Sequence, residues 1–265
     1  MFRFEIEATY LKTFINTLKE FTEYVNLQIT KQGIYVNTLD SSNVCLLDMH
    51  ILKEDMISYQ VDNETTLGVS VVLFDKVLKS AKKQVTITNN NLALHIEYEA
   101  KSGHLEYDLP GQDIPSEPIV IPPSEYSTEL SIDPSILANI CTELKVIGEN
   151  AKINVHQDGK VQFTSSDDLA GFATVTALDK ANKYNKNNKV SVVFTLSYLT
   201  KICKLSKICS NLQIKLSEKE SVPIKFDFST NTGSTYKFTL ATVVTDEEND
   251  NIDEDVVNVD SVAVM

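Results

Sequence analysis

Lysine side chains recur along four segments of the sequence in a pattern that could bind phosphate. An ammonium group attracts phosphate oxygens, and several such groups on one surface are the electrostatic footprint of a nucleic-acid-binding protein. The lysines concerned are Lys12 and Lys19; Lys76, Lys79, Lys82 and Lys83; Lys145; and Lys201, Lys204 and Lys207. The elements that carry these lysines decide whether they can act together.

Each of the four segments has the spacing of an amphipathic helix. In the first, Leu11, Phe14, Ile15, Leu18 and Phe21 share one face, and Lys12, Asn16 and Lys19 share the other. Positions seven apart differ by about 20° around a helix, so the lysines of one segment line up. For a single helix, the need for a charged face toward solvent is enough to explain its lysines. Four mostly positive faces favour nucleic-acid phosphate as the partner.

The overall charge of the chain argues against a nucleic-acid partner. The chain of 265 residues has a formal net charge of −13, which disfavours phosphate contact. Residues 246–265 read DEENDNIDEDVVNVDSVAVM and hold eight carboxylates and no basic residue, so we expect a solvated, disordered tail there. Without that tail the charge is about −5.

Motifs of catalysis and of metal binding are missing from the sequence. It has no P-loop, no HExxH, no GxSxG and no close carboxylate pair beside a histidine. The sequence therefore shows no motif that predicts catalysis. The four cysteines form no CxxC pair and the four histidines are scattered, so we predict reduced thiols, no metal site and no cofactor. Because neither an apolar run of about 20 residues nor a signal-peptide core is present, we expect a soluble intracellular protein with no membrane partner.

The sequence also contains an internal repeat. With a shift of 126 residues, Leu11, Phe14, Ile15, Leu18 and Lys19 fall on Leu137, Ile140, Cys141, Leu144 and Lys145. The same shift brings Leu27, Ile29 and Gly33 onto Ile153, Val155 and Gly159, and a shift of 125 brings the segment from Val69 to Lys79 onto that from Phe194 to Lys204. Each half therefore predicts two amphipathic helices and many strands.

The alternation of apolar and polar residues predicts strands that outnumber the helices. Examples are VTIT (85–88), LALHIEYE (92–99), INVHQ (153–157), LQIKL (212–216) and IKFDF (224–228). A stretch with five of the seven prolines, LPGQDIPSEPIVIPPSEYS, separates the halves and predicts an extended connector. We predict an α+β fold with a first domain at residues 1–117, a connector at 118–127, a second domain at 128–245 and an acidic tail at 246–265.

The turn Asp40-Ser41-Ser42-Asn43, between two alternating apolar runs, carries the clearest family signal. Its segment LDSSNVCLL resembles the MDSSHVSL segment of proliferating cell nuclear antigens, the eukaryotic DNA sliding clamps. The resemblance continues through LGVSVVLFDKVLKSA, IPPSEYS, ANICTELKVIGENAKINVHQDGKVQFTSS, VVFTLSYLTKIC, SVPIKFDF and FTLA. These motifs keep their order over nearly the whole chain, and residues beyond about 245 fall outside them.

The resemblance implies the DNA clamp fold and a ring. In that family each domain has two helices against curved antiparallel sheets, and three chains join head to tail with helices inside and sheets outside. The joining strands correspond here to about 104–109 and 171–178. The interface residues so implied are Leu105, Tyr107, Leu109, Phe172, Thr174 and Thr176.

The resemblance also implies which lysines face DNA. It matches family positions to Lys12, Lys19, Lys76, Lys79 and Lys204, and Lys82 belongs to the same basic segment. Thr13, Asn139 and Thr142 stand where family members commonly have Lys or Arg. Lys145, Lys201 and Lys207 lie within about one turn and could compensate.

A pocket for a one-turn helix of client proteins is the third implied site. The turn Asp40-Ser41-Ser42 would form its floor, beneath the connector. Its residues are Leu39, Asn43, Val44, Leu46, Ile119, Ile121, Pro122, Pro223, Leu240 and Ala241. Thr239 and Thr242 replace an aromatic residue and a proline common at the rim, which predicts weaker binding of standard clients.

The function so implied is a non-enzymatic processivity factor that encircles duplex DNA and tethers polymerase and other replication and repair proteins. Its expected partners are a clamp loader ATPase and two further copies of the chain, in the nucleus or at a viral replication site. A subunit of a hetero-oligomeric, checkpoint-type clamp stays open as an alternative. An acidic binding protein that mimics nucleic acid fits the charge but not the lysine faces.

Overall fold

Strands dominate the chain, as its period-two runs predict. The computed structural model describes residues 1–90, 93–115, 119, 124–167, 169–177, 180–184, 189–219 and 222–243. Half of the predicted connector, residues 118 and 120–123, and the whole of the predicted acidic tail, residues 246–265, lie outside this part of the chain. Among the described residues, no helix is long and apolar enough to cross a membrane.

The described residues of the first half of the chain form nine strands and two α-helices. In chain order they are β1 (Phe2–Glu7), α1 (Ala8–Lys19), β2 (Tyr24–Ile29), β3 (Gly33–Leu39), β4 (Cys45–Leu52), the 3₁₀ helix η1 (Lys53–Asp55), β5 (Ser58–Val61), β6 (Thr65–Ser70), α2 (Val71–Leu78), β7 (Gln84–Asn90), β8 (Ala93–Ala100) and β9 (Gly103–Pro110).

The second half follows nearly the same order, as the repeat predicts. Its elements are β10 (Thr128–Ile132), α3 (Pro134–Leu144), β11 (Asn150–Val155), β12 (Val161–Asp167), β13 (Gly171–Thr176), β14 (Val190–Thr195), α4 (Leu196–Ile202), the 3₁₀ helix η2 (Cys203–Lys207), β15 (Asn211–Leu216), β16 (Ile224–Ser229) and β17 (Thr235–Leu240). The short strand β5 is the clearest difference between the two halves in the described residues.

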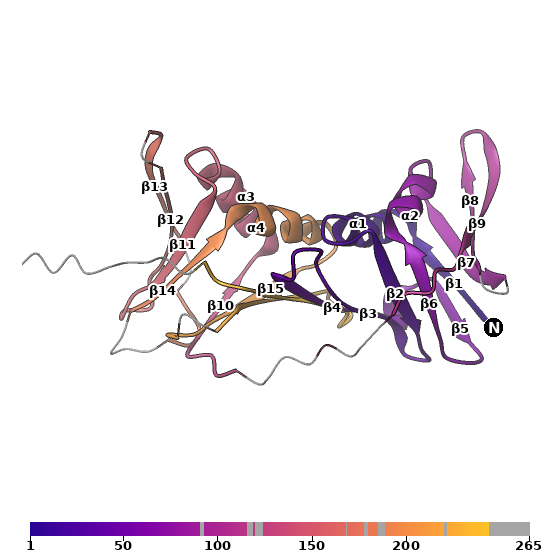
Figure 1. The fold of residues 1–265 in the computed structure, drawn as a ribbon, viewed down its shortest axis with the longest axis horizontal. Coiled ribbons are helices and arrows are strands. Elements are labelled where there is room, and N and C mark those ends of the chain that lie inside the picture. Colours follow the sequence, from indigo (N-terminus) through magenta and orange to yellow (C-terminus); the bar gives the residue numbers. More distant parts are fainter. Residues whose placement is uncertain are drawn as a thin grey trace, which may run out of the picture.

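Three antiparallel sheets arise from these strands. Their strand orders are β5-β1-β7-β8-β9, β10-β15-β16-β17-β4-β3-β2-β6 and β13-β12-β11-β14. The four helices lie in a row along one side of the sheets, the upper side in Figure 1, and β13 and β9 lie at opposite ends of the elongated molecule. The arrangement is therefore the predicted α+β one, with two similar halves that each place two α-helices against antiparallel sheets.

The central sheet joins the two halves through one strand pair. β17 of the second half pairs antiparallel with β4 of the first, and Phe238 lies opposite Leu47. Both side chains are fully buried, and the Phe238 ring lies 5.6 Å from that of Phe21. Burial of this kind contributes about 1.5–3 kcal/mol for each large apolar side chain.

A polar network reinforces the same seam on the side of α1. The Tyr10 and Tyr236 hydroxyls are 2.6 Å apart, and Tyr10 also donates to Asp55 at 3.1 Å. Asp55 further accepts hydrogen bonds from the hydroxyls of Thr230 (2.9 Å) and Thr232. Burial alone would raise the pKa of the Asp55 carboxyl, but these donors hold that pKa below its ordinary value.

Two of the α-helices, α2 and α3, begin at residues whose side chains cap them. Asp133 caps α3 by accepting the Ser135 N–H at 2.7 Å, and Pro134 occupies the first turn, where its missing N–H costs nothing. Ser70 caps α2 by accepting the Leu73 N–H. At the other end of α2, the Lys12 ammonium donates to the carbonyls of Lys79 (3.0 Å) and Ala81, and such a contact satisfies carbonyls that a helix end leaves open.

Two details of the predicted helices are wrong. α2 ends at Leu78, so Lys82 and Lys83 lie in the turn before β7 and not on a helix. α1 ends at Lys19, so Phe21 is buried from the following turn. In both places the backbone leaves the helix to enter the next strand. The helical spacing of the side chains continues beyond that point, so the spacing alone predicts a helix that is too long.

Candidate functional site

A cleft on the helix side of the molecule collects several of the predicted DNA-facing lysines. Its volume is about 460 Å³, and it lies where α1, α2 and η2 come together. The residues that line it are Lys12, Thr13, Asn16, Asp75, Lys79, Lys204 and Lys207. Four ammonium groups against one carboxylate make this cleft cationic in a protein of net charge −13, and such a surface suits an anionic ligand.

Three of the predicted DNA-facing lysines, two of them in this cleft, already have partners within the chain. Lys19 Nζ lies 2.6 Å from Asp75 Oδ2, and Lys204 Nζ lies 2.6 Å from Glu20 Oε1 and 2.8 Å from Asn16 Oδ1. Lys12 is turned toward the end of α2, as described above. Burial would raise the pKa of Asp75, but Lys19 holds it below its ordinary value. These lysines therefore join the helices to one another as well as adding positive charge.

The remaining predicted lysines differ in exposure. The side chains of Lys76, Lys79, Lys82, Lys145 and Lys207 are exposed. Lys201 lies over two aromatic rings, 4.9 Å from the centroid of Tyr198 and 5.5 Å from that of Phe21, which is the range of a cation–π contact. The exposed group is the better candidate for contact with a phosphate backbone. Asn139 and Thr142, at family positions for arginine, are also exposed but uncharged.

The turn between β3 and β4 is organised by one carboxylate. Asp40 Oδ1 accepts the N–H groups of Val44 (2.7 Å) and Cys45 (2.8 Å), and Oδ2 accepts that of Ser42 (3.3 Å). Asn43 adopts a left-handed conformation, with φ 56°, which asparagine tolerates better than most residues. Asp40 is 5% exposed. Its hydrogen bonds therefore fix the shape of the predicted pocket floor.

Asp40 also joins this turn to the second half of the chain. Tyr198 on α4 donates its hydroxyl to Asp40 Oδ2 at 2.8 Å. Burial would raise the pKa of Asp40, but the donors from Cys45, Tyr198, Val44 and Ser42 lower it overall. Burial and the neighbouring carboxylate raise the pKa of Tyr198 to about 12. The sequence pattern placed Asp40 in the turn but gave no signal for Tyr198, because the contact joins residues far apart in the chain.

The strand pairings gather most of the described pocket residues at one end of the central sheet. Leu39 pairs with Leu46, Leu46 pairs with Thr239, and Leu240 lies opposite Cys45 and Ile224. Ala241 donates its N–H to the Val44 carbonyl at 2.9 Å. Leu46 and Leu240 are buried, whereas Leu39, Val44 and Pro223 are half-buried and Asn43 and Ala241 are exposed. Ile119 is half-buried, and Ile121 and Pro122 lie outside the described residues.

Each of the two predicted interface strands is an edge strand of its sheet, and the two lie at opposite ends of the molecule. β9 ends the sheet of the first half, and β13 ends that of the second. Leu105 and Tyr107 are half-buried and Leu109 is buried, whereas Phe172, Thr174 and Thr176 are exposed. An edge strand presents unpaired N–H and C=O groups and can add a strand from another chain.

Known proteins resemble this chain over nearly all of its length. Residues 1–115 match the family model described as "Proliferating cell nuclear antigen, N-terminal domain", and residues 120–243 match that described as "Proliferating cell nuclear antigen, C-terminal domain". A proliferating cell nuclear antigen of Chaetomium thermophilum is 28% identical over 255 residues, 91% of this chain and 97% of the relative.

Two further relatives come from other organisms. A proliferating cell nuclear antigen of Dictyostelium discoideum is 24% identical over 84% of this chain and 91% of its own length. Proliferating cell nuclear antigen 2 of Plasmodium falciparum is 25% identical over 86% of this chain and 91% of its own length.

The Asp40 geometry predicts a pH-dependent stability. A carboxyl whose pKa is lower in the folded state stabilises the fold above its unfolded pKa, about 3.9, and this stabilisation is lost as the pH falls through the folded value. We expect Asp40→Asn to lower the free energy of unfolding at pH 7 by about 1–3 kcal/mol, because the amide offers one acceptor oxygen and no charge.

Urea unfolding of the parent and the variant, measured at pH 7 and at pH 3, checks this expectation. The difference between the two proteins should shrink at the lower pH. Asp113→Asn, which changes an exposed carboxylate outside the strands, serves as the control. A difference for Asp40→Asn that stays the same at both pH values would contradict the assigned role of the carboxylate.

Proposed function

The chain belongs to the proliferating cell nuclear antigen family of DNA sliding clamps and polymerase processivity factors, and we propose that three copies close head to tail into a ring around duplex DNA. The family is known as a non-enzymatic scaffold, and we propose that this chain likewise acts without catalysis of its own. The main observation in support of the ring is the strand pair β17–β4 in the central sheet.

The repeat turns this internal pair into a template for the contact between chains. β4 corresponds to β13 by the shift of 126, and β17 corresponds to β9 through their equivalent places in the sheets. The paired strands of the seam thus have their counterparts at the two ends of the chain. If one chain's β9 pairs with the next chain's β13 in the same register, Tyr107 lies opposite Ala173, because their counterparts Phe238 and Leu47 are partners.

The exposed apolar side chains at the two ends support the same contact. Ile136 on α3 is 39% exposed, Phe172 on β13 69% and Leu73 on α2 42%. By the shifts of 126 and 125 their counterparts are Tyr10, Leu46 and Tyr198, each buried or half-buried at the seam. Exposed apolar residues at positions that the repeat buries favour a partner surface there.

A ring of this kind would present the helix row to DNA. The exposed Lys76, Lys79, Lys82, Lys145 and Lys207 would then supply weak, sequence-independent contacts with phosphate. Because topology holds the ring on DNA, strong binding is unnecessary and would impede sliding. Lys12, Lys19 and Lys204 would strengthen the positive field while they also hold the helices together.

We propose further that polymerase and other replication proteins bind through short helical peptides at the pocket around Leu39, Val44 and Ala241, with the connector above it. Half-buried apolar side chains beside an exposed turn suit the apolar anchors of such a helix. We also propose loading by a clamp loader ATPase and a nuclear site of action, in line with the eukaryotic relatives.

The ring predicts a native mass close to three times the 29.6 kDa of one chain. Phe172→Asp places a carboxylate in the proposed contact and should shift the protein to monomers at micromolar concentration. Tyr107→Pro should do the same, because proline removes an N–H from β9 and distorts the ladder. Light scattering after size-exclusion chromatography measures both, and circular dichroism checks that each variant is folded.

Ile57→Asp is the matched control, because Ile57 is 58% exposed and lies on neither β9 nor β13. It should keep the parent mass. A parent that is monomeric alone would refute the homotrimer and support a hetero-oligomeric clamp, and folded trimers of both variants would refute this interface.

The lysine assignment predicts a loss of DNA contact without a loss of the ring. Replacing Lys76, Lys79 and Lys207 with alanine should reduce processive synthesis on primed DNA. It should also flatten the salt dependence of direct DNA binding, since each lost phosphate contact lowers the slope by about 1.

The control replaces Lys31, Lys160 and Lys237 with alanine, which removes the same charge from exposed sites in turns and on β17. Equal effects of the two triple variants would show that net charge matters and that the helix row does not.

The pocket assignment predicts weaker peptide binding when its apolar members change. Ile121→Asp and Ala241→Arg should each weaken binding of a labelled peptide carrying the family's client motif about thirtyfold, or about 2 kcal/mol. Fluorescence anisotropy measures the affinity, with Ile57→Asp as the control. Unchanged affinity in both variants would place the site elsewhere, and absent binding in the parent would show that Thr239 and Thr242 have changed the accepted clients.

A further inference from the structure

One face of the β8–β9 hairpin concentrates groups that can ligate a metal. The strands pair in the register Glu97↔Glu106 and Glu99↔His104, so strand alternation brings all four side chains onto the face that points away from the core. Two carboxylates directly opposite each other repel and destabilise a strand pair unless a cation lies between them.

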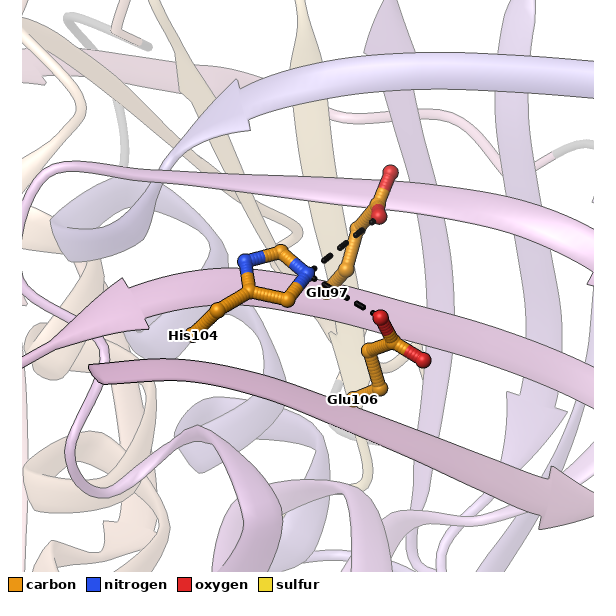
Figure 2. A group of neighbouring side chains, drawn as sticks. All are labelled: Glu97, His104 and Glu106. Carbon is orange, nitrogen blue, oxygen red and sulfur yellow. Dashed lines mark ion pairs between the residues drawn. The ribbon is translucent and has the colours of Figure 1, made fainter. Parts of the chain in front are cut away.

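We propose that Glu97, His104 and Glu106 bind a divalent transition-metal ion such as Zn²⁺. Their ligand atoms all lie within 4.8 Å of one another. His104 Nε2 is 3.2 Å from Glu106 Oε1 and 3.8 Å from Glu97 Oε2, and Figure 2 shows the imidazole directed at both carboxylates. Ligands about 2.1 Å from a tetrahedral ion lie about 3.4 Å apart, so small side-chain movements would complete the site.

Two neighbouring side chains orient the proposed ligands. His104 Nδ1 lies 2.9 Å from Glu99 Oε1, so Glu99 can accept the Nδ1–H of an imidazole whose Nε2 binds the ion. Arg3 donates to Glu97 Oε1 at 3.3 Å, which leaves Oε2 toward the site. A ligand histidine that donates its other N–H to a carboxylate is the usual arrangement at protein metal sites.

The donor set favours a transition metal over the hard cations. One imidazole with two carboxylates suits Zn²⁺, whereas Mg²⁺ and Ca²⁺ prefer sites made of oxygen ligands. His104 is 47% exposed in its side chain, so the fourth coordination position opens to solvent. All three ligands belong to one hairpin of one chain, so the ligand set is complete in a single chain, and two of the ligands lie on β9, the strand proposed to pair with the next chain.

Isothermal titration of the full-length chain with Zn²⁺ tests the proposal. Millimolar Mg²⁺ in the buffer occupies weak carboxylate sites such as those of residues 246–265. We expect one site per chain, a loss of binding of more than about 100-fold in His104→Gln, and a loss of about tenfold in Glu99→Gln, which removes the positioning partner of the imidazole. Binding should also weaken as the pH falls, because protons compete with the ion for its ligands.

His95→Gln is the matched control. His95 projects from the same face of β8 and lies 2.8 Å from Asp108, but it offers no atom to the proposed site. It should bind Zn²⁺ like the parent. Visible spectra of the Co²⁺-loaded parent should show tetrahedral coordination that His104→Gln loses. Absence of Zn²⁺ binding in the parent, or equal affinity of the parent and His104→Gln, would overturn the proposal.

Discussion

The pairing of β17 with β4 is the constraint on which the rest of the structure depends. It makes one eight-stranded sheet out of four strands from each half and so fixes the helices of both halves on the same side. The cationic cleft needs this alignment, because α1 comes from the first half and η2 from the second. The pocket residues need it too, since Val44 and Ala241 meet only where the two halves join. A shift of one residue in this register would turn every side chain of β17 to the opposite face.

Much of the fold could be predicted from the sequence, because the signals are local. Helical spacing around Leu11 and Phe14 and alternation in runs such as 224–228 depend on which side chains face the core, and the buried residues follow that pattern. The ends of the helices were harder to predict from the sequence. Nothing near Lys12 in the sequence indicates that its ammonium contacts the carbonyls that follow α2, nearly seventy residues further on.

For the candidate sites, too, local features could be predicted from the sequence and contacts between distant residues could not. The lysine spacing predicted a basic face, but only the folded chain separates exposed Lys79 from Lys204, which is paired with Glu20. Asp40 was recognisable as a turn residue, whereas its bond to Tyr198 crosses 158 positions. The sequence spacing of Glu97, His104 and Glu106 resembles no known ligand motif, because a hairpin brings ligands together by strand register and not by helical or short-loop spacing.

In a closed ring, the Tyr10–Tyr236 contact would make the two kinds of joint mechanically unequal. Within the chain, hydroxyl groups 2.6 Å apart connect to Asp55. At the joint between chains, the repeat places Ile136 and Leu105 at the corresponding positions, and these side chains cannot form hydrogen bonds. The joint inside each chain would therefore resist separation more strongly than the joint between neighbours. A force applied across the ring would open a gap at a boundary between chains and leave each chain intact, ready to close again around the next duplex.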